Sequence, residues 1–544
     1  MKRLVTIVLL FLTSSAFAQE KLSIVQRAMR DELERNMKEL KSEGFERPFF
    51  ISYTLQDLTI NSISATLGAI TNSFEAKSRS ALSVRLIVGD YEFNDESLDN
   101  NLFNQGQGNE IELPLDDDYL GIRRSLWLST DNVYRSASRK FARNTELLKE
   151  QGKPLSEVPH RTFVKVAPSK VDIPAPEFKF DKGATEEYLR KLSAVFKEYE
   201  KITDSYVGFV YRRGYRYLVN SEGSINRVPV TMATLYVTAS LRTSDDKQMF
   251  DGFHKQYSVP ELPPVETLIA EARKVAESLV DSQKLPEFTE EYMGPVLFEG
   301  EQLANLMFRE MFTRENSLVA NNNIPSLKGA RYESNFLDLK IGKPLFAEGM
   351  TVKATPKVKT FNGVPLFGSF EVDEEGVVPQ DEIVLVENGV LKQMCNDRSM
   401  TRSDQIANGM SDGPGVVMAS FKNAVPMATL KSKLIERARK EGLEYGIKVS
   451  IGRGNASDMK IYKVYVSDGH EELMREASMT GLEQRDFKKI VEASRELNVY
   501  NIDRADKIVS MICPQGVIFE EVEIKNALSP SLHDEEYVPS PLKK

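Results

Sequence analysis

The stretch that most constrains the fold covers residues 361–413, which contain three Asn-Gly pairs and an acidic cluster. One pair, Asn388-Gly389, separates the apolar runs EIVLV and VLKQM. A two-residue hairpin turn needs positive φ at both central positions, which Asn and Gly tolerate best, so the pair predicts a tight β-hairpin. Because residues 383–386 are apolar at every position, we expect this hairpin in the interior of a sheet.

The acidic cluster of the same stretch has the spacing of a calcium-binding loop. Glu371, Asp373 and Glu375 alternate, Gly376 follows them, and Glu382 stands at the twelfth position. A calcium loop needs oxygen ligands at this spacing and a Gly for its sharp turn. However, the longer Glu side chains crowd the ion at the first and fifth positions, and the flanks are strand-like. A solvated turn between strands is the alternative interpretation.

Length and composition bound the class of protein. The chain has 544 residues, more than one hydrophobic core supports, so two or three domains are expected. Its apolar content of 41% and charged content of 28% are typical of a folded protein. The net charge of −9 argues against nucleic-acid binding, which requires a basic surface.

The N-terminus predicts export. Lys2 and Arg3 precede an apolar core at residues 5–12, and Ala16-Phe17-Ala18 has the form of a cleavage site. This order is typical of a secretory signal peptide at residues 1–18, which implies a periplasmic or secreted protein. Gln19 follows instead of Cys, so no lipoprotein anchor is expected there. No stretch reaches about 18 consecutive apolar residues, so no membrane span is expected.

Hydrophobic periodicity predicts an α+β fold with two domains. In the first domain, residues 19–290, we expect helices at 21–43, 128–151, 185–202 and 265–283. Short antiparallel strands are expected at 50–90 and 206–257, two halves of one sheet-forming unit. The second domain, residues 291–528, is β-rich, with a strand at 295–298 and helices at 301–315, 431–443 and 484–497. Residues 529–544 are predicted to be a disordered tail.

Few residues of the types that carry chemistry are present. The only two cysteines, Cys395 and Cys513, exclude a disulfide framework. The histidines lack the HExxH or HExxxH spacing of a zinc helix; they are His160, His254, His470 and His533. A His-based zinc site could therefore form only from residues distant in sequence.

Four segments carry a resemblance to a known family. They are GPVLFEGEQLANLMF (294–308), VDEEGVVPQDEIVLVENGVLKQMCNDRSMTR (372–402), VYVSDGHEELMREASMTG (464–481) and SMICPQGVIFEEVEIKNA (510–527). In these segments the chain resembles the TldD/PmbA family, described as predicted zinc-dependent peptidases and earlier as modulators of DNA gyrase. The resemblance covers about residues 290–528 and implies a TldD/PmbA-type C-terminal domain.

The resemblance also implies a departure at the zinc site. One type of subunit in the family carries HExxxH on a helix and a late Cys as a third ligand; the other type lacks the histidines and partners the first. Here Glu299 and Ala304 occupy the places of the two histidines, and Gly300 that of the catalytic Glu. Cys513 matches the late Cys. This set cannot hold zinc in the family's way, and Gly300 removes the general base, although Glu301 follows directly.

Three hypotheses follow. The first is an exported, non-catalytic family member, with no cofactor expected, that binds peptides or unfolded segments at a sheet edge and forms a dimer with itself or with a catalytic relative. The second is an active metallopeptidase that holds zinc through Glu299, His470 and Cys513. The third is a calcium-stabilised extracytoplasmic binding module that uses the loop at 371–382.

Overall fold

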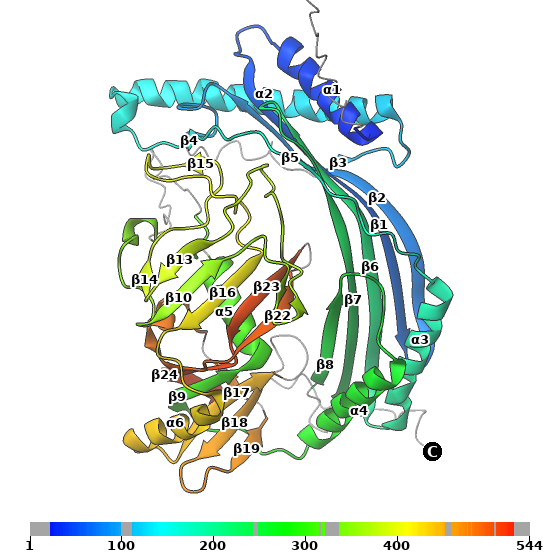
Figure 1. The fold of residues 1–544 in the computed structure, drawn as a ribbon, viewed down its shortest axis with the longest axis vertical. Coiled ribbons are helices and arrows are strands. Elements are labelled where there is room, and N and C mark those ends of the chain that lie inside the picture. The colour runs from blue at the N-terminus through cyan, green and yellow to red at the C-terminus, as the bar shows by residue number, and fades with distance from the viewer. Residues whose placement is uncertain are drawn as a thin grey trace, which may run out of the picture.

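The computed structural model describes residues 22–98, 111–242, 248–314, 317–320, 337–451, 459–475, 477–479, 481–504 and 507–526. The predicted signal peptide at 1–18 and the predicted tail at 529–544 lie outside these ranges. Within them, the fold is α+β, as predicted. A curved sheet carries helices on one face, and the C-terminal half of the chain lies on its concave side (Figure 1).

The N-terminal sheet is built from two long hairpins. β1 (Pro48–Thr66) pairs with β2 (Ala69–Val88), and β6 (Ile202–Asn220) pairs with β7 (Ile225–Arg242). β1 also pairs with β6, so the two predicted halves join in one sheet, extended by β8 (Gln248–Tyr257) beside β7. The prediction of several short strands was wrong, because each of the four strands in the hairpins continues for 18 to 20 residues. Two short strands, β3 (Ile111–Glu112) and β5 (Lys170–Asp172), complete the sheet.

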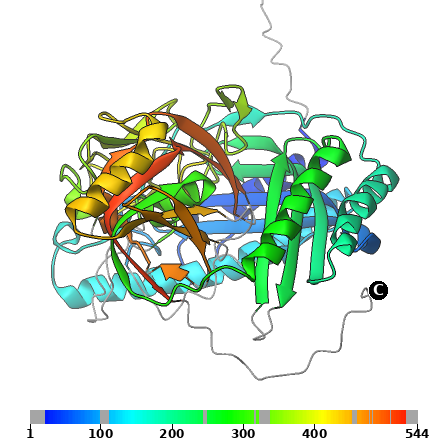
Figure 2. The same cartoon turned by 90° about the horizontal axis from the view of Figure 1, so that it is seen from below.

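Four helices cover the convex face as two pairs. α1 (Ile24–Glu39) and α2 (Tyr119–Gln151) bury one core with the end of the sheet that contains Tyr53 and Leu86. α3 (Lys182–Ala194) and α4 (Val265–Ser282) bury a second core with Phe209 and Leu235. The view from below shows α4 lying along the sheet, to the side of the C-terminal half (Figure 2).

The C-terminal half places helix α5 (Gly300–Phe312) between two sheets. One has the order β14-β13-β10-β16-β23-β22 and the other β19-β18-β17-β9-β24-β20, with β21 beside β24. Helix α6 (Met427–Lys440) packs on the outer face of the second sheet through Leu430 and Leu434. The strand bounds are β9 Tyr292–Glu299, β10 Met350–Ala354, β13 Ile383–Glu387, β14 Val390–Leu391, β16 Val416–Phe421, β17 Tyr445–Ile451, β18 Met459–Tyr465, β19 Glu471–Met474, β20 Ala477–Met479, β21 Ile490–Ala493, β22 Leu497–Asp503, β23 Ile508–Pro514 and β24 Gly516–Asn526.

Two local expectations need correction: the interior position of the Asn388-Gly389 hairpin and the helix at 484–497. The hairpin turn at Asn388-Gly389 is confirmed, with φ of 50° and 80°. Its second strand, β14, however, lies at the sheet edge, where the backbone of Gly342 and Lys343 bonds to Leu391 and shields it. The predicted helix at 484–497 was also wrong. A 3-10 turn (Gln484–Lys489) leads into β21 and then β22, because pairing with β24 and β23 overrides the local helical spacing.

Candidate functional site

The acidic turn that resembled a calcium loop is bound to side chains of the protein itself. Four of its carboxylates form ion pairs with four separate cations: Glu371 with Lys359 (3.1 Å), Glu374 with Arg216 (2.5 Å), Glu375 with Arg85 and Glu382 with Lys353 (2.9 Å). Arg85 and Arg216 belong to β2 and β6 of the N-terminal sheet. The turn therefore fastens the C-terminal half onto the N-terminal sheet.

Asp373 organises this turn from within. Its carboxylate accepts backbone hydrogen bonds from Glu375 (3.0 Å), Val377 (2.8 Å) and Ser411 (3.2 Å). Burial, with the nearby Glu375 charge, raises the pKa of Asp373 to about 6. A calcium loop requires its carboxylates to converge on one ion, whereas these point to different partners, so the arrangement does not fit a calcium site.

A buried ion pair reinforces the same contact. The Arg398 side chain is 0% exposed, and its Nη2 lies 2.7 Å from an oxygen of Glu222, which is 5% exposed. Its Nε donates to the Val164 carbonyl at 2.9 Å. The guanidinium also stacks over the Phe163 ring, 4.1 Å from its centroid. Glu222, Val164 and Phe163 all come from the N-terminal half, so the pair joins the two halves.

The positions assigned to the zinc motif lie where β9 passes into α5. Gly300 begins the helix with φ of 70° and donates its N–H to the Gln515 carbonyl at 3.0 Å. Ala304, one turn further along, is 0% exposed and packs in the core between the two sheets. Ala304 offers only a methyl group, which cannot bind a metal, and Gly300 has no side chain.

Glu299 ends β9 and keeps a half-buried carboxylate. Burial raises its pKa; the nearby Lys448 and Lys431 lower it, and Glu471 raises it further. Glu471 itself is held by ion pairs to Lys448 and, at 2.9 Å, to Lys431. Glu299 is thus one member of a charge network at the end of β9.

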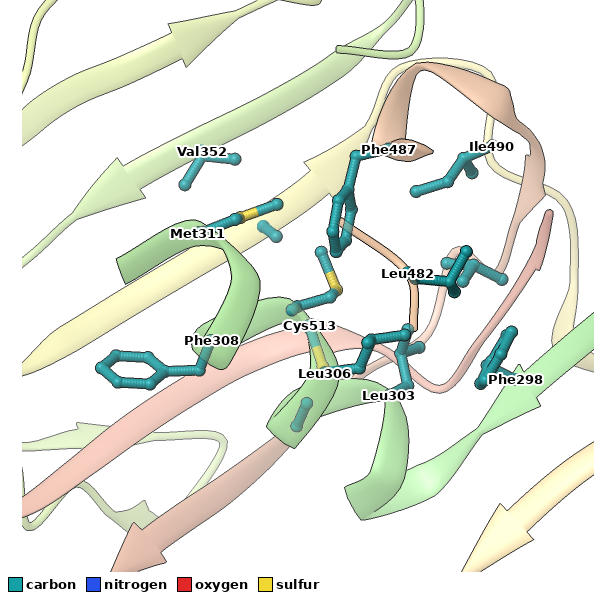
Figure 3. Packing of buried hydrophobic residues seen from close by; sticks show 14 of the residues in the cluster. Phe298, Leu303, Leu306, Phe308, Met311, Val352, Leu482, Phe487, Ile490 and Cys513 are labelled. Atoms are coloured by element: carbon teal, nitrogen blue, oxygen red, sulfur yellow. The ribbon is translucent and has the colours of Figure 1, made fainter. Parts of the chain in front are cut away.

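Cys513, which the resemblance matches to the late zinc ligand of the family, is sealed in the core. It lies on β23 and is 0% exposed. Figure 3 shows its thiol among Leu306, Met311 and Phe487. Burial raises the pKa of the thiol well above its ordinary value, which disfavours the thiolate that would bind a metal. Cys395 is likewise buried, and neither cysteine forms a disulfide.

His470 lies in a different environment from Glu299 and Cys513. Its ring stacks on Tyr465 with a centroid distance of 4.2 Å, and its Nδ1 bonds an Asp468 oxygen at 2.7 Å. No group of three or more His, Cys, Asp or Glu side chains within the described part of the chain could hold a metal ion. The set Glu299, His470 and Cys513 therefore does not fit zinc.

The structure instead brings together two residues that the sequence did not link. His254 Nε2 on β8 lies 3.5 Å from Glu301 Oε1 on α5, across the space between the N-terminal sheet and the C-terminal half. Burial raises the pKa of Glu301, and His254 lowers it. The Glu301 carboxylate is 33% exposed and so remains open to a ligand. The alternation of side chains along β8 indicates that His254 points toward the C-terminal half, but no sequence pattern indicates its partner.

Tyr500 on β22 lies within electrostatic range of Glu301 and Glu299. Burial, with the charges of Glu301 and Glu299, raises its pKa to about 12, while a hydrogen bond with Asn498 opposes the shift. The Asn498 amide lies 3.3 Å from the Tyr500 hydroxyl. We call Glu299, Glu301, His254 and Tyr500 the junction site. It offers carboxylates, an imidazole and a phenol, a set suited to hydrogen bonding with a polar ligand.

Comparison with known proteins relates the C-terminal part of the chain to a family. Residues 295–526 match the PmbA/TldA metallopeptidase C-terminal domain. No curated protein matches the sequence. The fold is similar to that of a proposed modulator of DNA gyrase from Bacteroides thetaiotaomicron, with a TM-score of 0.58 and 13% identity over 92% of this chain and 98% of the other.

Two further structures share the fold. A proposed modulator of a DNA gyrase from Thermotoga maritima has a TM-score of 0.54 and 13% identity, over 91% of this chain and 99% of its own. TldE from Thermococcus kodakarensis has a TM-score of 0.51 and 13% identity, over 93% and 100%. The C-terminal part of the chain, residues 295–526, therefore belongs to the TldD/PmbA family, and the chain as a whole shares the fold of these three proteins.

Proposed function

We propose that this protein is a non-catalytic member of the TldD/PmbA family that binds peptides or unfolded segments at the junction site. The observation that carries the proposal is the residue set at the zinc-motif positions. Glu299, Gly300 and Ala304 replace HExxxH, Ala304 is enclosed by the core, and Cys513 is sealed from solvent. These residues cannot form the three-ligand site of a zinc hydrolase, and Gly300 has no side chain that could act as the general base.

Two unpaired strand edges support a role in binding extended chains. In the part of the chain that the structure describes, β22 pairs only with β23, and β8 pairs only with β7. The sheets that contain the two strands touch near the junction site: Tyr236 of β7, which pairs with His254 of β8, donates to Asp503 of β22 at 2.8 Å. An extended peptide can add to such an edge through its backbone, while nearby side chains select its residues.

The junction site supplies groups for that selection. Glu301 can accept from a peptide amide or a cationic side chain, and His254 and Tyr500 can each donate or accept. Because Glu301 is partly desolvated, a hydrogen bond to its charged form is stronger than one in open solvent. The site thus has the chemistry to hold a peptide without cleaving it.

The proposal is tested by metal analysis and peptide binding on the full chain. We expect zinc well below one atom per chain, reversible binding of a fluorescent peptide by anisotropy, and no cleavage of it. E301Q should weaken binding several-fold. E34Q, which removes an exposed carboxylate on α1, should bind like the wild type. Stoichiometric zinc with cleavage abolished by a chelator would overturn the proposal.

Location and partnership belong to the same proposal. The N-terminal pattern supports export, and the family's paired subunits support a dimer with itself or with a relative that retains HExxxH. Fractionation of cells and N-terminal sequencing of the mature protein test export, which fails if the N-terminus stays intact in the cytoplasm. Co-purification from the native source tests the partner. The described residues include no helix with the length and apolarity needed to cross a membrane.

A further inference from the structure

The outer face of α2 exposes apolar side chains that the fold does not use. Leu120, Trp127 and Leu128 are 69%, 44% and 56% exposed. At 3.6 residues per turn, positions 120, 127 and 128 lie on one side of the helix, opposite the buried Leu126 and Val133. We call these three residues the α2 ridge. It lies at the end of the molecule formed by α1 and α2 (Figure 1).

Positive charge follows the same face. Arg124, Arg135 and Arg139 are exposed between and beyond the apolar residues of the ridge. The helix as a whole has seven Lys and Arg against three Asp and Glu, in a chain with a net charge of −9. The nearest acidic groups are held within the protein. Asp131 and Arg135 pair at 2.8 Å and neutralise each other, which leaves Arg124 and Arg139 as the exposed cations of this face; Asp117 pairs with Arg79 at 2.9 Å, Asp118 caps the helix, and Asp116 is an opposing charge at the ridge's end.

The size of the ridge decides between kinds of partner. Its three side chains expose apolar surface on the order of 300 Å², below the roughly 800 Å² per partner of a stable protein interface. Peripheral binding to a bilayer needs less, because a few apolar side chains enter the headgroup region while basic residues attract anionic lipids. Trp is the residue type that favours this interface.

We infer that the α2 ridge is a docking surface for an anionic lipid bilayer, with Trp127 and Leu128 entering the headgroup region and the arginines bound to lipid phosphates. The ridge is separate from the junction site, so this inference does not rest on the proposed function. It describes peripheral attachment of the folded protein and involves no helix that crosses the membrane.

Trp127 is the only Trp in the chain, so its fluorescence reports on this surface alone. The full chain is mixed with phosphatidylcholine vesicles, with and without phosphatidylglycerol. We expect Trp emission to shift to shorter wavelength and the protein to sediment with the anionic vesicles, and both effects to decline at high salt. The double variant L120S/L128S and the double variant R124E/R139E should each lose most of the binding.

A charge reversal elsewhere provides the matched control. R485E alters an arginine that is 79% exposed in the C-terminal half and should leave vesicle binding unchanged. Circular dichroism checks that every variant is folded. Absence of binding to anionic vesicles, or binding that persists in both double variants, overturns the inference. A concentration-dependent dimer that shields Trp127 without vesicles also overturns it, because the occupant is then a second copy of the chain.

Discussion

Replacing Arg398 with methionine tests how strongly the two halves are held together. Methionine fills much of the volume of arginine but removes the charge that neutralises Glu222. Arg398 and Glu222 are 0% and 5% exposed, so the remaining carboxylate stays in a dry environment. Breaking such a pair from one side costs about 3–5 kcal/mol, and the Val164 carbonyl loses a donor worth about 1 kcal/mol.

Tyr91 offsets part of this loss, since its hydroxyl still donates to Glu222 at 2.8 Å. We therefore expect R398M to destabilise the protein by about 4 kcal/mol. The second change, E222Q, removes the isolated charge, so the double variant E222Q/R398M should cost only about 1–2 kcal/mol.

Urea unfolding followed by circular dichroism measures these costs from the shift in midpoint. R135M is the control, because Arg135 is exposed and its loss should leave the midpoint near that of the wild type. The reasoning is refuted if R398M costs less than about 1 kcal/mol, or if the double variant is as unstable as the two single variants added together.

Three further predictions concern single features. Burial raises the pKa of Asp373 from 3.8 to about 6, so the folded state binds the proton of this carboxyl more tightly than the unfolded state does. Protonation of Asp373 therefore stabilises the fold; the effect is complete below pH 3.8 and is lost as pH rises through 6. The melting temperature of the wild type relative to D373N should fall over that range, and a pH-independent difference contradicts the linkage. G389A should destabilise by about 2 kcal/mol or more, since a Cβ there lies 2.7 Å from the Ala347 carbonyl and φ is 80°; a midpoint equal to that of the wild type refutes this. Cys395 and Cys513 should resist a thiol reagent in the native protein and react in urea, whereas rapid native labelling shows that one of them is accessible.

Locally encoded features of the fold could be predicted from the sequence. The capping box of Ser23 and Gln26 and the apolar spacing after it suffice to define α1. The hairpin at Asn388-Gly389 was predictable for the same reason, because both residues of the turn are adjacent. The length of the N-terminal strands was not, because polar residues such as Asn61 resemble a loop although they are buried within the sheet.

The candidate site was only partly accessible from sequence. Glu299, Ala304 and Cys513 followed from the family resemblance, and the structure then showed how deeply two of them are enclosed. The acidic turn could not be interpreted without its partners, because Arg85 is 290 residues from Glu375 in the chain. His254 and Glu301 lie in different halves, so their contact depends on how the halves pack and leaves no local pattern.

The φ of 70° at Gly300 and the enclosure of Ala304 set a structural cost on introducing HExxxH at residues 299–304. A glutamate at Gly300 finds space but must adopt a left-handed backbone, which costs about 1 kcal/mol or more. A histidine at Ala304 overpacks a filled core, which typically costs about 1–3 kcal/mol. Because a metal returns stability only when all its ligands are present, each single substitution toward HExxxH is disfavoured. The local backbone and the core packing thus favour Gly300 and Ala304 over the residues of a zinc motif.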